Sequence, residues 1–400
     1  MWFPVEAQGQ ERTPQTATTT TFAAVDPATI EVRQANVVVR ISTAAETALP
    51  AAGGIADVRW VAATPGGFAV VDPASSMVGF FDESGEWLGH AGSRGEGPGE
   101  FSGRISNAVS HGGHLWVPDP RNRRLNVIDI STRSWLRSTS LDILAGFPVT
   151  WLSPGNGELV AVLWGYGAES RNWSVRRWTG DALETAFRWV DEEGRHGWGA
   201  RILVVEAAGE GMVALLDRQA GVVDVYDLSG SLAARYVFDD DAALALSGDD
   251  RAYLDRLREP MLARAADNVA RRLSALSAQV PRNVRDELGR GAAESRVAQP
   301  SHFSDRYPFF LDVRFDPGCE TIWVARPLTA NEIRDLPVQL DWAVLGNSSR
   351  YWDAYTFDGT FRYRLEVPLG FIVTDVQDGR FYGYQVDALG LRHAVVLSLP

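Results

Sequence analysis

The chain has 400 residues, of which 45% are hydrophobic, 22% charged and 10% aromatic. This balance is typical of a folded globular protein and excludes disorder, collagen and coiled coil. All 38 basic residues are arginine and 51 residues are acidic, which gives a net charge of -13. An acidic surface repels phosphate backbones, so we expect no nucleic-acid partner. No apolar run approaches 18 residues, and we therefore expect no membrane span.

Residues 1–28 are expected to form a flexible tether, because residues 11–22 are polar and rich in threonine. Residues 1–10 lack the charged and apolar regions of a signal peptide but resemble the residues that precede a cleavage point. The lone cysteine, Cys319, cannot form an intrachain disulfide and needs no reducing compartment. We expect an extracytoplasmic protein, periplasmic or secreted, whose sequence as given lacks its signal peptide.

A short unit recurs in which an apolar strand ends in aspartate and a second strand ends in another aspartate ten residues later. The three clear copies carry the pairs Asp72 and Asp82, Asp119 and Asp129, and Asp217 and Asp227. Weaker copies of the first strand end at Trp164, Arg326 and Gln385. Successive strand ends are 47, 45, 53, 109 and 59 residues apart. Apart from one long interval, this spacing approximates the 40 to 50 residues of a four-stranded propeller blade.

These units predict an all-β fold, a six-bladed β-propeller over residues 29–400, with a helical insertion between blades four and five at about residues 241–300. Five or seven blades are the alternatives. The last unit ends one strand short of a blade, while the apolar stretch from Thr29 has no blade of its own. Pairing residues 29–42 with residues 391–399 satisfies two sheet edges at once, so we expect this pairing to close the ring.

The connection after the first blade reads GSRGEGPGEFSG and resembles the loop of NHL-type repeats. The matching residues are Gly92, Gly95, Gly97, Pro98, Gly99, Glu100 and Phe101 in the loop, followed by Asp119, Asn122 and Arg124. The resemblance implies membership of the six-bladed propellers of bacteria, which are mostly exported and largely without an assigned activity. A phosphate cradle is not expected, because such a loop must open a helix and usually carries a lysine.

Residues 249–280 change the hydrophobic period from two to 3.6, with an apolar stripe from Leu254 to Val280 that predicts helix. Ser247 is placed to cap its start. A solvated helix face with ion pairs is one interpretation. In another the stripe packs across a propeller face as a lid, and in a third it packs against a second copy. We expect a monomer.

The innermost strands should line a central channel, and their polar residues include Arg59, Asn107, Thr150, Arg201, Glu206, Asp312, Arg314 and Asp375. Arginine, histidine and aromatic residues at one rim suit an anionic or sugar-like ligand. The candidate ligand-binding residues are Arg59, Asn107, His196, Trp198, Arg201, His302 and Tyr307. Ordinary rim residues are the alternative interpretation. No histidine pair has metal-binding spacing, and we expect no metal, cofactor or dedicated catalytic residue.

The leading hypothesis is a non-catalytic exported propeller that binds a small ligand, a glycan or a partner protein at one face or in the channel. The alternative is a hydrolase, lactonase or lyase of the propeller type, with its site in the channel. Convergence of three or more of Asn107, Glu206, Asp312 and Asp375 favours that alternative. An RNA-binding role, known among some NHL-type propellers, is disfavoured by the negative charge.

Overall fold

A computed structural model describes residues 17–23, 25, 29–43, 54–105, 107–141, 147–153, 158–166, 171–180, 182–190, 205–207, 211–218, 220–239, 247–253, 256–257, 260, 263, 307–335 and 348–399. Within these ranges only the backbone is described for residues 147–150, 163–166, 171–173, 188–190 and 205–207. The candidate site residues His196, Trp198, Arg201 and His302 lie outside the described residues.

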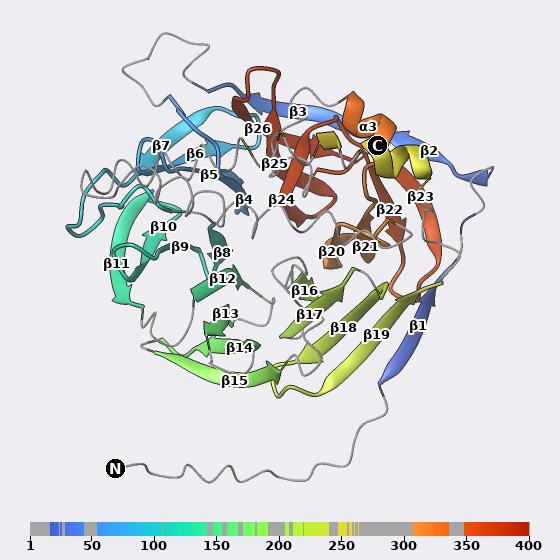
Figure 1. The fold of residues 1–400 in the computed structure, drawn as a ribbon. Helices are drawn as coiled ribbons and strands as arrows, with labels where there is room; N and C mark the ends of the chain where they lie inside the picture. Colours follow the sequence, from blue (N-terminus) through green and yellow to red (C-terminus); the bar gives the residue numbers. More distant parts are fainter. Residues whose placement is uncertain are drawn as a thin grey trace.

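The described strands form six sheets arranged around a common axis, each with one edge strand nearest the axis (Figure 1). Blade one comprises β4 (Trp60–Thr64), β5 (Gly67–Asp72), β6 (Met77–Asp82) and β7 (Trp87–Ala91). Blade two comprises β8 (Val109–His111), β9 (His114–Asp119), β10 (Arg124–Asp129) and β11 (Ser134–Ser140). Blade three comprises β12 (Phe147–Leu152), β13 (Val160–Tyr166), β14 (Arg171–Trp178) and β15 (Leu183–Val190).

Blade four comprises β16 (Val205–Ala207), β17 (Met212–Asp217), β18 (Val222–Asp227) and β19 (Leu232–Phe238). Blade five comprises β20 (Asp312–Asp316), β21 (Thr321–Ala325), β22 (Tyr351–Tyr355) and β23 (Phe361–Glu366). Blade six comprises β24 (Phe371–Gln377), β25 (Arg380–Val386), β26 (Arg392–Ser398) and, from the other end of the chain, β3 (Asn36–Ile41). The prediction of an all-β, six-bladed propeller is confirmed.

Strand β3 closes the ring by pairing antiparallel with β26, from Asn36 opposite Ser398 to Ile41 opposite Ala394. It takes the outermost position that the three C-terminal strands leave open, as the missing strand in the last unit indicated. Its Val39 is buried, whereas Val37 on the same strand is 52% exposed. The closing strand therefore contributes both a hydrogen-bonded ladder and a side chain to the core.

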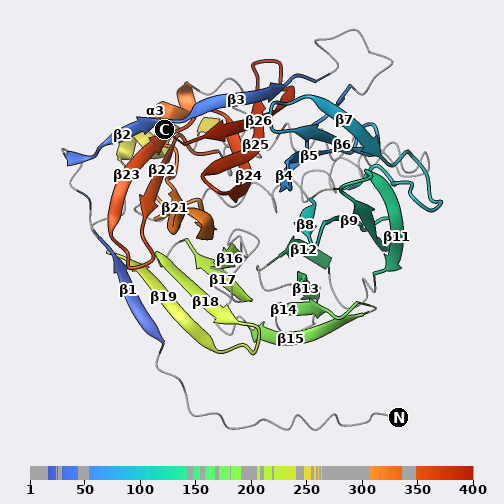
Figure 2. The same ribbon diagram turned by 180° about the vertical axis from the view of Figure 1, so that it is seen from behind.

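Two further N-terminal strands lie outside the ring of blades. Strand β1 (Thr18–Phe22) pairs in parallel with β19, and β2 (Val32–Gln34) pairs in parallel with β23. Both views show β1, β2 and β3 following the outer rim of blades four, five and six in turn (Figures 1 and 2). The expectation of a flexible tether is therefore wrong for Thr18–Phe22. Threonine is β-branched and favours extended backbone, and Phe22 adds a buried anchor.

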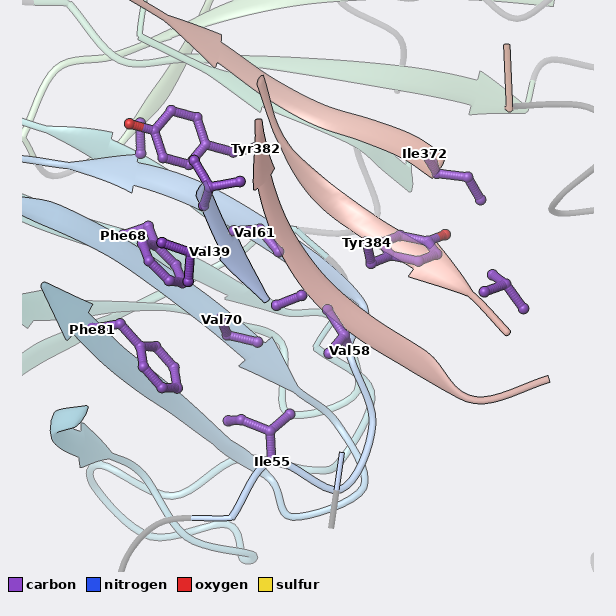
Figure 3. Close-up of a cluster of buried hydrophobic side chains, with 14 of the residues drawn as sticks. Val39, Ile55, Val58, Val61, Phe68, Val70, Phe81, Ile372, Tyr382 and Tyr384 are labelled. Carbon is purple, nitrogen blue, oxygen red and sulfur yellow. The ribbon is translucent and has the colours of Figure 1, made fainter. Parts of the chain in front are cut away.

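Hydrophobic clusters fill the gaps between neighbouring blades, so the core is divided around the ring. Figure 3 shows the cluster between blades six and one, where Phe68 and Phe81 stack beside Tyr382. Tryptophans fill other gaps: Trp116 and Trp151 lie between blades two and three, and Trp323 and Trp352 lie between blades five and six. Each blade is thereby held mainly by its two neighbours.

The repeated aspartates are turn-forming residues. At the end of the second strand, buried Asp72 accepts hydrogen bonds from the backbone N–H of Ser75 in its own turn and of Ala56 in the segment before β4. At the end of the third strand, Asp82 accepts from Ser84 N and Glu86 N. The ten-residue spacing of these aspartates thus reflects two successive turns of one blade.

In the Gly-rich connection after blade one, glycine supplies backbone angles and Phe101 is the anchor. Phe101 is buried, and a Cβ on Gly92 would lie 2.3 Å from its ring. Gly92 also has a φ of +94°, which disfavours any other residue. Asn122 donates to Gly95 O at 3.0 Å and Arg124 donates to Glu96 O at 2.9 Å, so blade two holds the loop in place.

The chain leaves blade four after Phe238 and enters blade five at Asp312. Within this connection residues 248–253 are helical, and Ser247 caps them by accepting a hydrogen bond from Asp250 N at 3.0 Å. Most of the expected helix lies outside the described residues, so the insertion is not confirmed over its length. Figures 1 and 2 place the described helical residues over blades five and six.

A second excursion, which the sequence did not suggest, separates β21 from β22. It contains α3 (Ala330–Arg334), which begins with a capping box between Thr329 and Glu332. Leu328 and Ile333 belong to the cluster between blades six and one, and Tyr253 of the first excursion packs against the same cluster. The guanidinium of Arg334 lies 4.4 Å from the centre of the Tyr253 ring. The two excursions are therefore packed together on the propeller.

Candidate functional site

The innermost strands β4, β8, β12, β16, β20 and β24 surround the axis of the propeller (Figure 1). Because strand direction alternates within a blade, all connections that lead into innermost strands emerge on the same face. The chain leaves β19 and enters β20 on this face, which we call the insertion face. Of the candidate residues, Arg59 immediately precedes β4, Asn107 lies two residues before β8, and Tyr307 lies five residues before β20.

These three residues differ in exposure. Arg59 is exposed, whereas Asn107 is 7% exposed and Tyr307 is 2% exposed. The Tyr307 hydroxyl accepts a hydrogen bond from Ala330 N at 3.0 Å, at the start of α3. Burial of this side chain raises its pKa to about 12. Tyr307 thus anchors α3 to the propeller, and Arg59 is the candidate whose side chain faces solvent.

A chain of polar contacts crosses the innermost strands of blades five and six. Arg314 on β20 forms an ion pair with Asp312 on the same strand, with Nη2 and Oδ2 2.9 Å apart. Both side chains are largely buried. Arg314 Nη1 also donates to the carbonyl oxygen of Thr374 on β24 at 3.4 Å. One arginine therefore spans two blades while a carboxylate neutralises its charge.

The same chain continues from blade six to blade one. The buried Thr374 hydroxyl donates to Val61 O at 2.6 Å and accepts from Val61 N at 3.2 Å, on β4. Next to it, Asp375 Oδ2 accepts from Ala63 N at 2.8 Å. Side chains of β24 thereby satisfy backbone groups on the axial edge of β4, where no strand in the described ranges pairs.

We call Asp312, Arg314, Thr374 and Asp375 the axial polar cluster. Desolvation raises the pKa of Asp375 to about 6. Hydrogen bonds from Ala63 N and Val376 N and the charge of Arg314 act in the opposite direction, and the charge of Asp316 adds to the increase. Asp375 therefore changes protonation state near neutral pH, which distinguishes it from an ordinary surface aspartate.

The sequence placed Asp312, Arg314 and Asp375 on innermost strands, and the structure brings all three to neighbouring strands. It missed Thr374, which sits where the pairing of β24 with β25 shifts between Val373 and Asp375. An irregularity of this kind reorients a side chain and breaks simple alternation. A polar Thr-Asp pair inside an otherwise apolar strand was the available signal.

Asp312 and Asp375 do not form the compact group of carboxylates that would favour an enzyme. Asp312 is engaged by Arg314, and Asp375 is engaged by backbone N–H groups of β4 and β24. The Glu206 side chain lies outside what the structure describes. In the described part of the chain no group of three or more His, Cys, Asp or Glu residues is arranged to hold a metal ion.

No protein-family model and no curated protein matches the sequence. Solved structures do match. A Bacteroides fragilis protein that is assumed to be exported is 11% identical, with a TM-score of 0.55 over 96% of this chain and all of that one. Regucalcin from Agrobacterium tumefaciens, described as a calcium-binding protein, is 13% identical, with a TM-score of 0.43 over 96% of each chain. A streptogramin B lyase is 10% identical, with a TM-score of 0.40 over 90% of this chain and 97% of that one.

Among the helices in the described ranges, none combines the length and the apolar character needed to cross a bilayer. At 11% identity, the similarity to the Bacteroides fragilis structure shows fold and nothing finer. The chain is a six-bladed β-propeller.

Proposed function

We propose that this protein is a non-catalytic, exported β-propeller of the NHL-repeat-like type that binds a small ligand, a glycan or a partner protein on its insertion face. The loop from Gly92 to Phe101, held by Asn122 and Arg124, supports the assignment to this type. The assumed export of the Bacteroides fragilis structural neighbour supports the location. Net charge -13 disfavours a nucleic-acid partner.

The axial polar cluster is the observation that carries the proposal. It places a guanidinium, a hydroxyl and two carboxyl groups on adjacent innermost strands. Exposed Arg59 lies where the chain enters β4, two residues before Val61, whose backbone bonds to Thr374. Polar groups from several blades around one axis suit an anionic or sugar-like ligand, for which arginine provides directional donors.

We further propose that residues 241–300 form a helical lid over this face of a monomeric propeller, in preference to a solvated helix or a dimer contact. The packing of Tyr253 and Leu257 against the cluster between blades six and one supports this assignment. His196, Trp198, Arg201 and His302 are proposed to complete the ligand-binding rim with Arg59 and Asn107. No cofactor is proposed.

Calorimetric titration with glucuronate and with glucose tests the proposal. Glucuronate is expected to bind, and Arg59→Ala is expected to weaken it at least tenfold, because an exposed guanidinium pairs with the carboxylate. Arg362→Ala is the control, since Arg362 donates to Cys319 O beside a turn on the opposite face. If neither glucuronate nor glucose binds, this ligand class is contradicted. It is also contradicted if Arg59→Ala and Arg362→Ala weaken glucuronate binding equally.

The competing function, a hydrolase, lactonase or lyase, is favoured by one observation. Asp375, with a pKa of about 6, can exchange a proton near neutral pH, as a general acid or base must. The test is hydrolysis of a panel of sugar lactones across pH 5 to 8. An enzyme of this kind predicts a rate that changes near pH 6 and is abolished in Asp375→Asn. No turnover above the uncatalysed rate leaves the binding function in place.

A further inference from the structure

Strand β1 is an addition to an already complete blade. Its five residues pair in parallel with β19, from Thr18 opposite Ala234 to Phe22 opposite Phe238, and β1 is the last strand of that sheet. Along β1 only Phe22 is buried, while Thr19 and Thr21 are exposed. The strand is therefore held by one backbone ladder and one side chain, an arrangement typical of a bound peptide.

Phe22 occupies an aromatic socket that two blades build together. Its ring centre lies 4.3 Å from that of Phe238 and 5.5 Å from that of Tyr236, both on blade four. On the other side it lies 4.6 Å from the ring of Tyr355 on blade five. We call Tyr236, Phe238 and Tyr355 the Phe22 socket. At 2% exposure, Phe22 fills a site to which blade four alone contributes only part of the walls.

The end of β1 is fixed to blade five as well. Ala23 N donates to Gly359 O at 3.1 Å, in the turn between β22 and β23. A Cβ on Gly359 would lie 2.7 Å from Thr21 O, so the turn and the strand are in close contact. The segment thus contacts the backbone of both blades. Its position is therefore determined by blade five as well as by the edge of β19.

This contact joins blades four and five, which the chain connects by a long excursion. Between blades five and six the chain runs directly from Glu366 of β23 to Phe371 of β24. Between blades four and five it departs after Phe238 and returns only at Asp312. Strand β1 spans this junction from outside, as a clamp that joins β19 to the blade five turn.

We propose that the outer edge of β19 together with the Phe22 socket is a binding site for an extended peptide segment that ends in an aromatic residue, and that β1 is its built-in occupant. In such a site main-chain pairing gives affinity and the socket gives specificity. The ligand class is an uncharged, β-branched strand that ends at a phenylalanine and continues by at least one residue, as Thr18–Phe22 continues into Ala23. The site is distinct from the axial polar cluster, and it accepts the same segment supplied by a separate molecule.

Cutting the folded protein provides the test. A protease recognition sequence replacing residues 24–28 allows the full chain to fold before β1 is severed from β2. After cleavage, gel filtration is expected to show the N-terminal fragment still bound. A fluorescent peptide of residues 16–24 is expected to exchange with it in an anisotropy titration. Because the aromatic anchor is lost, the Phe22→Ala peptide is expected to bind at least tenfold more weakly.

The Thr21→Ala peptide is the matched control, since Thr21 is exposed and its main chain still pairs. Equal binding by the wild-type and Phe22→Ala peptides overturns the proposal, as does immediate loss of the severed wild-type fragment. Thermal unfolding of the cut ring provides a second measurement. Added wild-type peptide is expected to raise its midpoint, and a midpoint that stays unchanged at saturating peptide also overturns the proposal.

Discussion

Blades six and one meet where the closing N-terminal strand passes into the first blade, and blades four and five meet where the chain departs for residues 239–311. An N-terminal strand reinforces each junction. At the first junction β3 is the outermost strand of blade six and buries Val39 in the shared core. At the second junction β1 is added outside a complete blade and buries Phe22 alone.

The contacts inside the two junctions also differ. Between blades six and one, Thr374 and Asp375 bond directly to the backbone of β4, in addition to the hydrophobic cluster of Figure 3. Between blades four and five the described contacts are mainly aromatic packing, with Phe22 among them. From this comparison we predict that one junction is integral to folding, while the other is fastened by a segment that can leave. Damage to the first should unfold the ring, and damage to the second should release β1.

Introducing a charge at Val39 should give the largest effect. Val39→Asp places an unpaired carboxylate in the core between blades six and one, and we expect the free energy of unfolding in urea to fall by about 3 to 5 kcal/mol. Val37→Asp is the control on the same strand, because Val37 is 52% exposed. It should change stability by less than about 0.5 kcal/mol. Equal effects of the two substitutions would show that β3 is not integral to the ring.

The second prediction concerns pH at the same junction. The pKa of Asp375 is raised from 3.8 to about 6 in the folded protein, so between these values the folded state binds a proton that the unfolded state does not. Stability therefore decreases as pH rises from about 4 to 6, by roughly 2 to 3 kcal/mol from this group. Urea unfolding at pH 4 and pH 7 should show a smaller decrease in Asp375→Asn. Other carboxylates are common to both proteins, and an identical decrease in the two would contradict the assignment.

Removing the Thr374 hydroxyl should have a smaller effect. Thr374→Val keeps the shape of the side chain but deprives Val61 N and Val61 O of their partner across the junction. Burial of these unpaired groups should lower the free energy of unfolding by about 1 to 2 kcal/mol. Thr374→Ser retains the hydroxyl and should recover most of the loss. If serine is no better than valine, packing of the methyl group, and not the hydrogen bonds, joins the two blades here.

The sequence predicted the parts of this ring that depend on local chemistry. Asp72 and Asp82 indicated two turns, because their side chains accept hydrogen bonds from the turn backbone. Strand β3 was predicted because the last unit lacked a strand. Strand β1 was not found, because Thr18–Phe22 is polar except for its last residue. Its conformation depends on a socket formed by Tyr236 and Tyr355, far along the chain.

The candidate site shows the same division. Asp312, Arg314 and Asp375 were recognised because a charged residue inside an apolar strand is conspicuous. Their connection across blades depends on Thr374, whose orientation follows from a shift in strand pairing that sequence alternation does not reveal. The Tyr307 side chain, which resembled a rim residue, is buried beneath α3 because the excursion after β21 covers it. Local patterns therefore identified the residues, and contacts between distant segments determined what each one does.

The smallest expected effect tests the clamp itself, by comparing two turn glycines. Gly359 and Gly390 have φ values of +83° and +81°, so alanine at either position costs a similar conformational strain of about 1 kcal/mol. A Cβ at Gly390 meets nothing within 4 Å, whereas at Gly359 it would lie 2.7 Å from Thr21 O of β1.

Both substitutions should lower the free energy of global unfolding about equally, because β1 can move away without unfolding the ring. Only Gly359→Ala should displace β1, and chymotrypsin cleavage after Phe22 should then become about tenfold faster than in Gly390→Ala under native conditions. Equal cleavage rates would mean that β1 is as integral to the ring as β3, and the difference between the two junctions would disappear.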